Sequence, residues 1–243
     1  MRVPRIYHPA SISLQTETEL SPDAFQHLIK VLRLNVGDSI VLFNGDGQNY
    51  EAKITSVQKK SAQFIATHSQ ANASESSVNV HLAQVVSRGD RMDFVLQKSV
   101  ELGVTEITPL FSERCGVKLS GDRLEKKQLQ WQKIVHSACE QCGRSVVPQV
   151  NPAQQLAGFI ESSFEGLRLT LDPTATQPLS SFQQADKGIQ LLIGPEGGFT
   201  DTEVSAAEQQ GFKPMRLGPR VLRTETAALS ALTAVQYQFG DLS

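Results

Sequence analysis

The fold of this chain is decided by two stretches, IQLLIGPEGGF (residues 189–199) and LGPRVLRTETA (residues 217–227). Each follows or contains the end of a short apolar run, passes through a glycine-containing turn and leads into a helical pattern. Ile189–Ile193 is nearly continuously apolar, which is typical of a strand buried on both faces. Thr200 and Glu203 have the spacing of a capping box, which predicts that a helix begins there. We expect two strand-turn-helix units side by side, with both turns at the ligand-binding carboxyl edge of a parallel sheet.

The second stretch leads into the last helix. Thr224 is a candidate N-cap, and Gly240 is a candidate terminator. One helical face between them is apolar, formed by Ala228, Leu229, Leu232, Val235 and Phe239. Small residues flank this face, so the helix is expected to be buried on several sides.

Neither turn matches the common nucleotide-binding motifs. Residues 194–198 (GPEGG) lack the G-x-G-x-x-G spacing, and no Lys-Ser or Lys-Thr pair follows as in a P-loop. Glu196 would also repel a phosphate. The turn therefore favours a ligand without phosphates, held by backbone groups; a plain strand-to-helix turn is the alternative for this motif taken alone.

Strand and helix patterns alternate through the rest of residues 78–243, which predicts a parallel α/β sheet. We expect strands at 78–86, 104–111 and 167–171 and helices at 92–102 and 122–142. Residues 1–70 are β-rich instead, with a helix starting at Ser21-Pro22, strands at 39–43, 50–57 and 64–67, and a hairpin turn at Asn44–Gly47. The polar segment 69–77 reads as a linker. The prediction is a small N-terminal β-barrel joined to a larger α/β domain.

The composition excludes several classes of protein. Net charge is −2, so no global field attracts nucleic acid, although residues 112–144 are locally basic. No apolar run reaches the length of a membrane span, and the first residues lack the core of a signal peptide. Three cysteines do not make a disulfide framework, and Cys139-x-x-Cys142 has no second ligand pair, so no metal site is expected. These features favour a cytoplasmic protein.

The two stretches together resemble the SPOUT, or α/β-knot, methyltransferases, and in particular the RsmE family of 16S ribosomal RNA uracil-N3 methyltransferases. The resemblance extends over the whole chain. It includes MRVPRIY (1–7), residues 27–33, QKSVELG (97–103), SERCGVK (112–118) and ACEQCGR (138–144). It implies a C-terminal SPOUT domain at 78–243 with a trefoil knot, and a PUA-like RNA-binding barrel at 1–70. A knot is exceptional among protein folds and rests on the resemblance alone.

The resemblance implies that S-adenosylmethionine lies bent across three loops, at residues 171–173, 193–198 and 217–227. The implied cofactor-binding residues are Leu171, Ile193, Gly194, Pro195, Glu196, Gly197, Leu217, Gly218, Val221, Leu222, Thr224, Thr226 and Ala227. The family pattern has a histidine where this chain has Asp172, so only a backbone contact is implied there.

Methylation of uracil N3 requires that the N3 proton be removed or the uracil anion be stabilised. The turns offer Glu225 as an acid/base group and Arg220 and Arg223 as cations. Glu225 is also explained by the helix dipole, which favours an acid in the first turn. Arg223 is not, because a cation is unfavourable at a helix start, and we interpret it as functional.

The resemblance also implies partners: 16S rRNA in the small ribosomal subunit, with uridine 1498 as the family target, and a second copy of the chain in a homodimer. Candidate RNA-binding residues are basic or border basic surfaces: Arg5, His27, Lys30, Arg33, Arg114 and Arg144. Two alternatives stay open. One is a SPOUT enzyme that methylates a ribose 2′-O or guanine N1, and the other is a non-catalytic RNA-binding or assembly protein.

Overall fold

The computed structural model describes residues 3–183 and 187–242. The chain divides into two compact units, which we describe separately: Met1–Glu75 with His136–Val147, and Ser76–Val135 with Pro148–Ser243. The predicted linker is strand at its start, because β5 continues to Ala71. The long helix α3 (Gly121–Cys142) contributes its last residues to the N-terminal unit.

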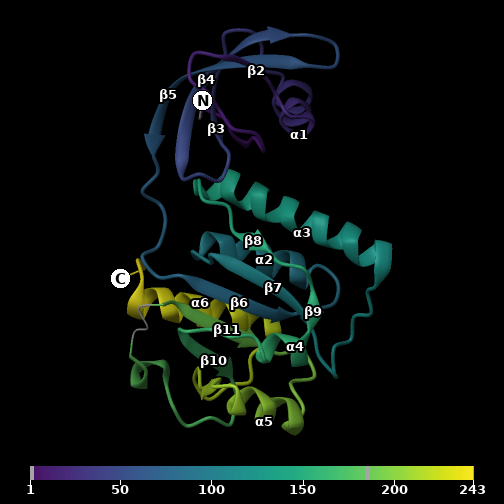
Figure 1. The fold of residues 1–243 in the computed structure, drawn as a ribbon, viewed down its shortest axis with the longest axis vertical. Helices are drawn as coiled ribbons and strands as arrows, with labels where there is room; N and C mark the ends of the chain where they lie inside the picture. The colour runs from purple at the N-terminus through teal and green to yellow at the C-terminus, as the bar shows by residue number, and fades with distance from the viewer. Residues whose placement is uncertain (1–2, 184–186, 243) are drawn as a thin grey trace. The chain divides into compact units, whose positions relative to one another are not determined.

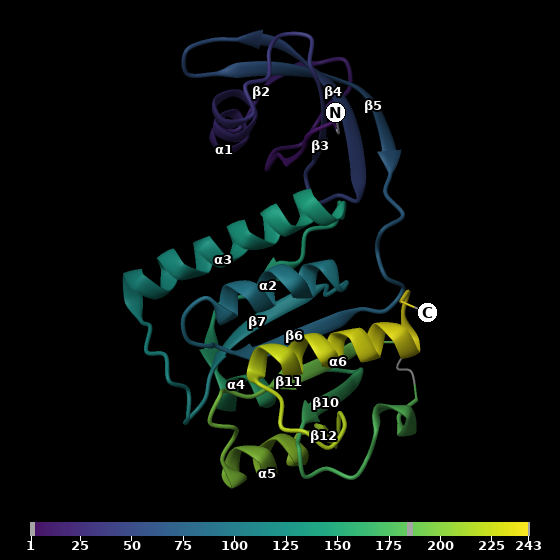
Figure 2. The ribbon, with the colours of Figure 1, turned by 180° about the vertical axis from the view of Figure 1, so that it is seen from behind.

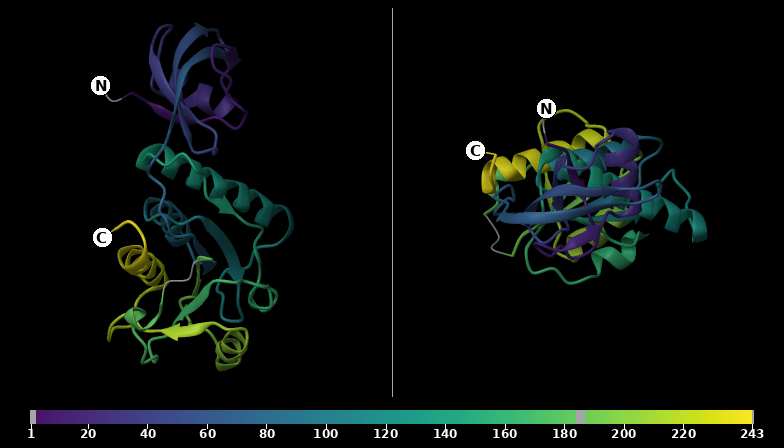
Figure 3. Two further views of the ribbon diagram at one scale, coloured as in Figure 1. Left: turned by 60° about the vertical axis from the view of Figure 1, so that its left-hand side comes forward. Right: turned by 90° about the horizontal axis from the view of Figure 1, so that it is seen from above.

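The N-terminal unit contains a five-stranded sheet in the order β1-β3-β4-β5-β2. The strands are β1 (Arg5–Tyr7), β2 (Glu17–Glu19), β3 (Ser39–Phe43), β4 (Gln48–Val57) and β5 (Ala62–Ala71). The predicted hairpin joins β3 to β4, which pair antiparallel. Gly45 and Gly47 in its turn have φ of +98° and +83°, a conformation that glycine adopts without strain. The curled sheet is seen from the side in Figure 3.

A helical segment packs against this curled sheet. Ser21 caps α1 (Pro22–Phe25), because its hydroxyl accepts a hydrogen bond from the Ala24 N–H at 3.3 Å. The segment then widens into the π-helix η1 (Gln26–Val31). Ala24, Phe25, Leu28 and Ile29 enter the core formed by the strands. This confirms the predicted PUA-like class of small β-rich domain.

The C-terminal unit contains a parallel sheet in the order β12-β10-β11-β6-β7-β8, with β9 pairing with β7 (Figure 1). The strands are β6 (Val80–Val85), β7 (Glu106–Phe111), β8 (Gln149–Val150), β9 (Gln154–Gln155), β10 (Leu167–Leu171), β11 (Ile189–Ile193) and β12 (Lys213–Met215). All of their pairings are parallel. The predicted α/β class is therefore confirmed, whereas the trefoil knot stays a prediction.

Helices cover both faces of this sheet. Figure 2 shows α2 (Arg91–Glu101) and α6 (Thr224–Phe239) together on one face, where they contact each other. On the other face, α4 (Leu156–Ile160) and α5 (Asp201–Gln209) pack on a core that includes Ala83, Val85 and Leu192. A short 3₁₀ helix, η2 (Leu179–Ser181), follows β10. Within the described residues, no helix is long and apolar enough to cross a membrane.

One expectation about the order of strands is wrong. The strands before the two glycine turns, β11 and β12, are not neighbours, because β10 lies between them and pairs with both. Periodicity identifies a buried strand but does not fix its place in a sheet. The correction has a consequence for the site, since it inserts the loop after Leu171 between the two turns.

Candidate functional site

Three loops meet at the carboxyl edge of the C-terminal sheet. They follow Leu171 of β10, Ile193 of β11 and Met215 of β12, and because these strands are parallel neighbours their ends lie together. Backbone hydrogen bonds join the loop after β10 to the loop after β12. The Asp172 N–H donates to the Met215 carbonyl at 3.1 Å, and the Arg216 N–H donates to the Gln177 carbonyl at 2.9 Å. The structure thus brings together the three loops predicted to hold the cofactor.

The start of α6 is tied to the Gly194 turn. Thr224 donates its hydroxyl to the Gly194 carbonyl at 2.6 Å and accepts from Nε2 of Gln84 at 3.0 Å. The predicted cap is therefore misplaced by one residue. Arg223 is the N-cap and makes no side-chain cap bond, whereas Thr224 is the first helical residue. Its hydroxyl is already engaged by the neighbouring strands' ends, so it does not cap the helix.

Two glycines of the turns, Gly198 and Gly218, adopt left-handed backbone conformations. Gly218 has φ of +73° with open space where a Cβ would lie, and Gly198 has φ of +68°. A Cβ on Gly194 would lie 3.2 Å from the ring of Phe199, so this turn is closely packed. The capping box predicted for Thr200 and Glu203 is present and fixes where the turn ends.

The residues predicted to bind the cofactor differ in how far they are exposed to solvent. Ile193, Pro195 and Thr224 are buried. Leu171, Gly194, Leu217, Leu222 and Ala227 are half-buried, and Glu196, Gly197, Gly218, Val221 and Thr226 are exposed. Val221 is 81% exposed, which is unusual for a valine and leaves its side chain free to contact a ligand or a partner.

Two carboxylates of the site, Glu196 and Glu225, pair with the same arginine, Arg91, which was not predicted from the sequence. Nη1 of Arg91 lies 3.0 Å from Oε1 of Glu196, and its Nε lies 3.8 Å from Oε1 of Glu225. Burial raises the pKa of Glu196, but hydrogen bonds from its own and the Arg88 backbone N–H and from Arg91 outweigh this effect. Its pKa therefore lies below the ordinary value, and Glu196 is a poor proton acceptor at neutral pH.

Polar atoms near the turns lack partners. Oε1 of Gln84 and Oε2 of Glu225 are buried and have no hydrogen-bond partner among the described residues. Such atoms are rare in folded proteins because leaving them unpaired is costly. Both are acceptors, so they suit a ligand that carries a donor or a positive charge.

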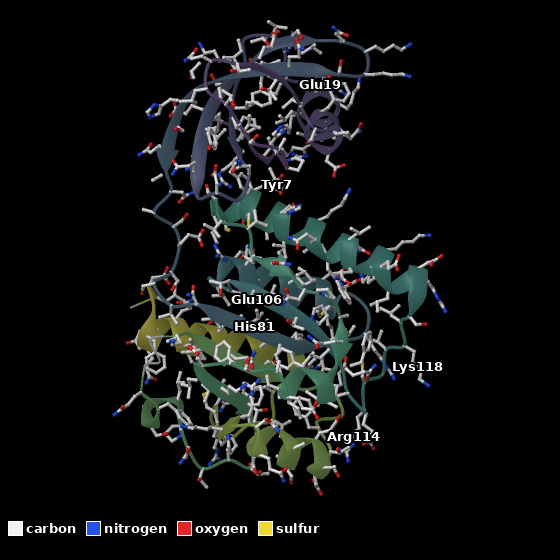
Figure 4. The ribbon with its side chains drawn as sticks, viewed as in Figure 1. Tyr7, Glu19, His81, Glu106, Arg114 and Lys118 are labelled. Carbon is white, nitrogen blue, oxygen red and sulfur yellow. The ribbon has the colours of Figure 1, made fainter. Side chains whose placement is uncertain are left out.

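A cleft of about 930 Å³ opens beside these groups. It is lined by the loop after β6, the start of α2, the loop after β7, the turn after β11 and the first turn of α6. The lining residues are Arg88, Gly89, Asp90, Arg91, Phe94, Arg114, Gly116, Glu196, Gly197 and Glu225. Arg114, whose position is shown in Figure 4, donates to the carbonyls of Gly197 and Phe199 at 3.2 and 3.3 Å. Arg88, Arg91 and Phe94 were not predicted. They follow the strand predicted at 78–86, and this position at the carboxyl end of a strand could have indicated them as site residues.

The two arginines predicted to be catalytic are exposed. No described residue forms an ion pair or side-chain hydrogen bond with Arg220 or Arg223. Arg223 lies at the N-cap of α6, which is the positive end of the helix dipole. A cation held there without a compensating carboxylate remains available to a negative ligand.

The RNA-binding candidates of the N-terminal unit separate into two groups. Nη2 of Arg5 donates to the Arg144 carbonyl at 2.7 Å and to the Ser145 hydroxyl at 2.8 Å, and its Nη1 donates to the Cys139 carbonyl at 2.6 Å. Arg144 is 4% exposed and pairs with Glu75. Both arginines are engaged by these internal contacts. They are therefore less available to bind RNA than the sequence suggested.

His27, Lys30 and Arg33 remain on the surface at or just after the π-helix. Arg33 has φ of +59°, a left-handed conformation that is uncommon for a residue with a side chain. Both π-helices and backbone strain concentrate at functional sites. His27, Lys30 and Arg33 therefore stay candidates for RNA binding.

Comparisons with known proteins agree with this architecture. A model of an RNA methyltransferase domain matches residues 74–236, and a model of an RNA methyltransferase PUA domain matches residues 20–67. The chain is 37% identical over 243 residues to ribosomal RNA small subunit methyltransferase E of Buchnera aphidicola, covering 100% of this chain and 99% of the relative. It is 32% identical over 228 residues to the protein of that name from Bacillus subtilis, covering 90% and 89%.

Solved structures give the same result. A methyltransferase of Legionella pneumophila, determined with bound SAM, has a TM-score of 0.96 and 43% identity, with 100% of both chains covered. Ribosomal RNA small subunit methyltransferase E from Neisseria gonorrhoeae, bound to S-adenosyl methionine, has a TM-score of 0.93 and 40% identity, with 100% of both chains covered. The match of fold, domain order and full-length sequence places this chain in the ribosomal RNA small subunit methyltransferase E family of RNA methyltransferases.

Proposed function

We propose that this protein transfers a methyl group from S-adenosylmethionine to N3 of a uridine in 16S rRNA, the family's uridine 1498. The observation that carries the proposal is the meeting of three loops at one sheet edge, beside a cleft that contains both carboxylates and arginines. Family membership supports a methyltransferase of small-subunit rRNA. The choice of uracil N3 rests on the resemblance to the RsmE family, and the carboxylates and arginines around the cleft are compatible with the proton removal that it requires.

The residues present fit the cofactor. Its sulfonium supplies an activated methyl group, and its positive charge suits the unpaired Oε2 of Glu225. Ile193, Leu217 and Leu222 offer apolar contact for an adenine ring. Gly218 allows a ligand to approach the backbone closely, because the space where its Cβ would lie is open.

The chain's own groups divide the work of activating uracil. N3 must lose its proton before it becomes nucleophilic, and we assign the stabilisation of the resulting anion to Arg223 at the N-cap of α6. Arg220 is the alternative cation. N–H donors hold the pKa of Glu196 below its ordinary value, which makes Glu196 a poor proton acceptor, and we assign proton removal from N3 to Glu225.

The same proposal includes a homodimer and a cytoplasmic location, where ribosomal RNA is found. Large apolar side chains are exposed around α6: Tyr237 is 68% exposed and Val221 is 81% exposed. A second copy covering α6 would bury them. Sedimentation as a dimer at micromolar concentration supports this arrangement, and a fully active monomer refutes it.

The test of the proposed reaction is methyl transfer from labelled S-adenosylmethionine to small subunits from cells that lack the gene. Alkaline hydrolysis of the product separates the alternatives, because a ribose 2′-O-methyl group blocks cleavage of the adjacent phosphodiester. Label released in single nucleotides supports base methylation, and label retained in dinucleotides indicates ribose methylation. Absence of transfer favours a non-catalytic assembly protein.

A further inference from the structure

The cleft beside the cofactor loops contains an aromatic ring that packing does not explain. Phe94 is 46% exposed, although Met92, Val95 and Leu96 around it on α2 are buried. It lines the cleft together with Arg88, Arg91 and Arg114. An exposed aromatic ring bordered by arginines is the combination with which proteins bind unstacked nucleobases.

The three arginines are not equivalent in charge. Arg91 is neutralised by Glu196 and Glu225, so it orients the carboxylates and has little charge left for a ligand. Arg114 donates only to neutral carbonyls. No described residue pairs with the side chain of Arg88, and Asp90 is the one other carboxylate among the residues that line the cleft. Arg88 and Arg114 therefore retain charge for an anionic ligand.

The side chain of Arg88 is exposed, and its guanidinium lies close to the backbone of Gly116. A Cβ at residue 116 would clash with Nε and Nη2 of Arg88. The guanidinium packs over the glycine backbone, at one wall of the cleft. The missing side chain at residue 116 therefore makes room for this guanidinium.

We propose that the cleft binds the target nucleotide, with its base extruded from the RNA and stacked on Phe94, and with the adjoining phosphates on Arg88 and Arg114. This inference rests on the proposed function and adds the residues that bind the acceptor. Enzymes that modify bases take them out of the stack, because the reacting atom is otherwise inaccessible. The cleft volume of about 930 Å³ is large enough for a nucleotide. Glu196, Gly197 and Glu225 belong both to its wall and to the cofactor loops, which places the base next to the donor.

The stacking contact can be measured directly with Phe94→Trp, saturated with S-adenosylhomocysteine to prevent turnover. The probes are a short RNA with one central uridine and the same RNA with an abasic centre. Indole emission is expected to be quenched by the uridine RNA, with affinity roughly 10- to 100-fold higher than for the abasic RNA. Leu129→Trp, at an exposed position on α3, is the matched control and should respond to neither.

The phosphate contact is tested by Gly116→Ala and Arg88→Gln. Both should weaken RNA binding. In a plot of the logarithm of the binding constant against the logarithm of salt concentration, both should also reduce the magnitude of the slope by about 0.7, the value for one phosphate on a single strand. Gly116→Ala is informative because it moves the guanidinium without removing the charge. Gly158→Ala on α4, where an added Cβ meets nothing within 4 Å, is the control and should behave as wild type.

The outcomes separate this inference from the proposed function. Equal quenching by both RNAs, no quenching, or an unchanged salt dependence in both variants overturns the nucleotide site. A Phe94→Trp protein that loses its dimer, and binds both RNAs equally, shows instead that a second copy covers the ring. Wild-type methyl transfer is measured in parallel: transfer without selective quenching defeats only this inference, and selective quenching without transfer defeats only the proposed reaction.

Discussion

The Thr224 hydroxyl donates to the Gly194 carbonyl across 2.6 Å, so the first residue of α6 is bonded to the turn that follows β11. The same hydroxyl accepts from Gln84 at the end of β6. One side chain thus joins a helix and two strand ends. This contact makes the geometry of the Gly194 turn depend on the position of α6.

Replacing Thr224 tests this coupling. Thr224→Val keeps the shape but removes the hydroxyl that donates to the Gly194 carbonyl and accepts from Gln84, which costs about 1–3 kcal/mol of unfolding free energy. It should also weaken cofactor binding, measured by calorimetry. Thr224→Ser keeps the hydroxyl and should remain near wild type in both measurements. Equal behaviour of the two variants would show that the hydroxyl is not responsible.

Gly218 tests the position of the cofactor. Its φ of +73° and the open space beside it are suited to a ligand passing close to the backbone. Gly218→Val is expected to abolish S-adenosylmethionine binding while the circular dichroism spectrum is retained. Gly37→Val is the control for backbone strain, because Gly37 has φ of +93° and open space in the other unit. Cofactor affinity that survives in Gly218→Val removes this turn from the site.

Arg223 tests the catalytic assignment. Arg223→Ala should bind S-adenosylmethionine normally but lower kcat by roughly 10²–10³, because the lost cation acts only on the charge that develops on uracil. Raising the pH toward the pKa of uracil N3 should restore part of the rate, since solvent then supplies the anion. Turnover at the wild-type rate near neutral pH would give the arginine a structural role and direct attention to Arg220.

Arg33 tests the RNA surface of the N-terminal unit. Arg33→Gly removes a charge and also relieves the left-handed backbone at φ of +59°. The melting temperature should therefore stay the same or rise, while RNA affinity falls and depends less on salt. Lys53→Gly, at an exposed strand position, is the control for charge loss elsewhere. Unchanged RNA binding in Arg33→Gly excludes a role in recognition.

A buried histidine, His8, and a partly buried one, His81, predict how stability depends on pH. Burial lowers the pKa of His8, and it lowers that of His81 against the opposing effect of Glu106, with Arg168 lowering it further. The unfolded chain then binds more protons than the folded one below pH about 6.5, so stability is complete above that pH and is lost as the pH falls.

Each histidine contributes at most about 1.4 kcal/mol per pH unit in this window. Urea unfolding between pH 5 and pH 8 measures the slope of the unfolding free energy against pH. His8→Phe combined with His81→Gln should flatten it, whereas His68→Gln, at an exposed position, should leave it unchanged. A slope that is the same in all three proteins would contradict the assignment.

Patterns local in sequence predicted most of the fold. The apolar run Ile189–Ile193 is β11, the capping box at Thr200 is present, and Gly240 ends α6. Relations between distant segments were not predictable in this way. Whether β10 lies between β11 and β12 depends on pairings made in three dimensions, and hydrophobic periodicity contains no information about them.

The candidate site also divides into residues that local sequence patterns indicated and residues that only the three-dimensional fold brings together. Glycine turns and charged residues in the two C-terminal stretches indicated the cofactor loops. Arg91 and Phe94 precede those stretches by more than ninety residues, and only the fold brings them to Glu196 and Glu225. Conversely, Arg5 and Arg144 looked like surface cations, but their partners are backbone carbonyls and Glu75 in the same unit.

The most direct test of the account is the identity of the methylated nucleoside. Small subunits from cells lacking the gene are incubated with the purified protein and S-adenosylmethionine, and the 16S rRNA is digested and analysed by mass spectrometry. The account predicts one new N3-methyluridine per RNA, formed by the wild type and strongly reduced with Arg223→Ala. A product of 2′-O-methyluridine or N1-methylguanosine, or no product at all, would contradict it.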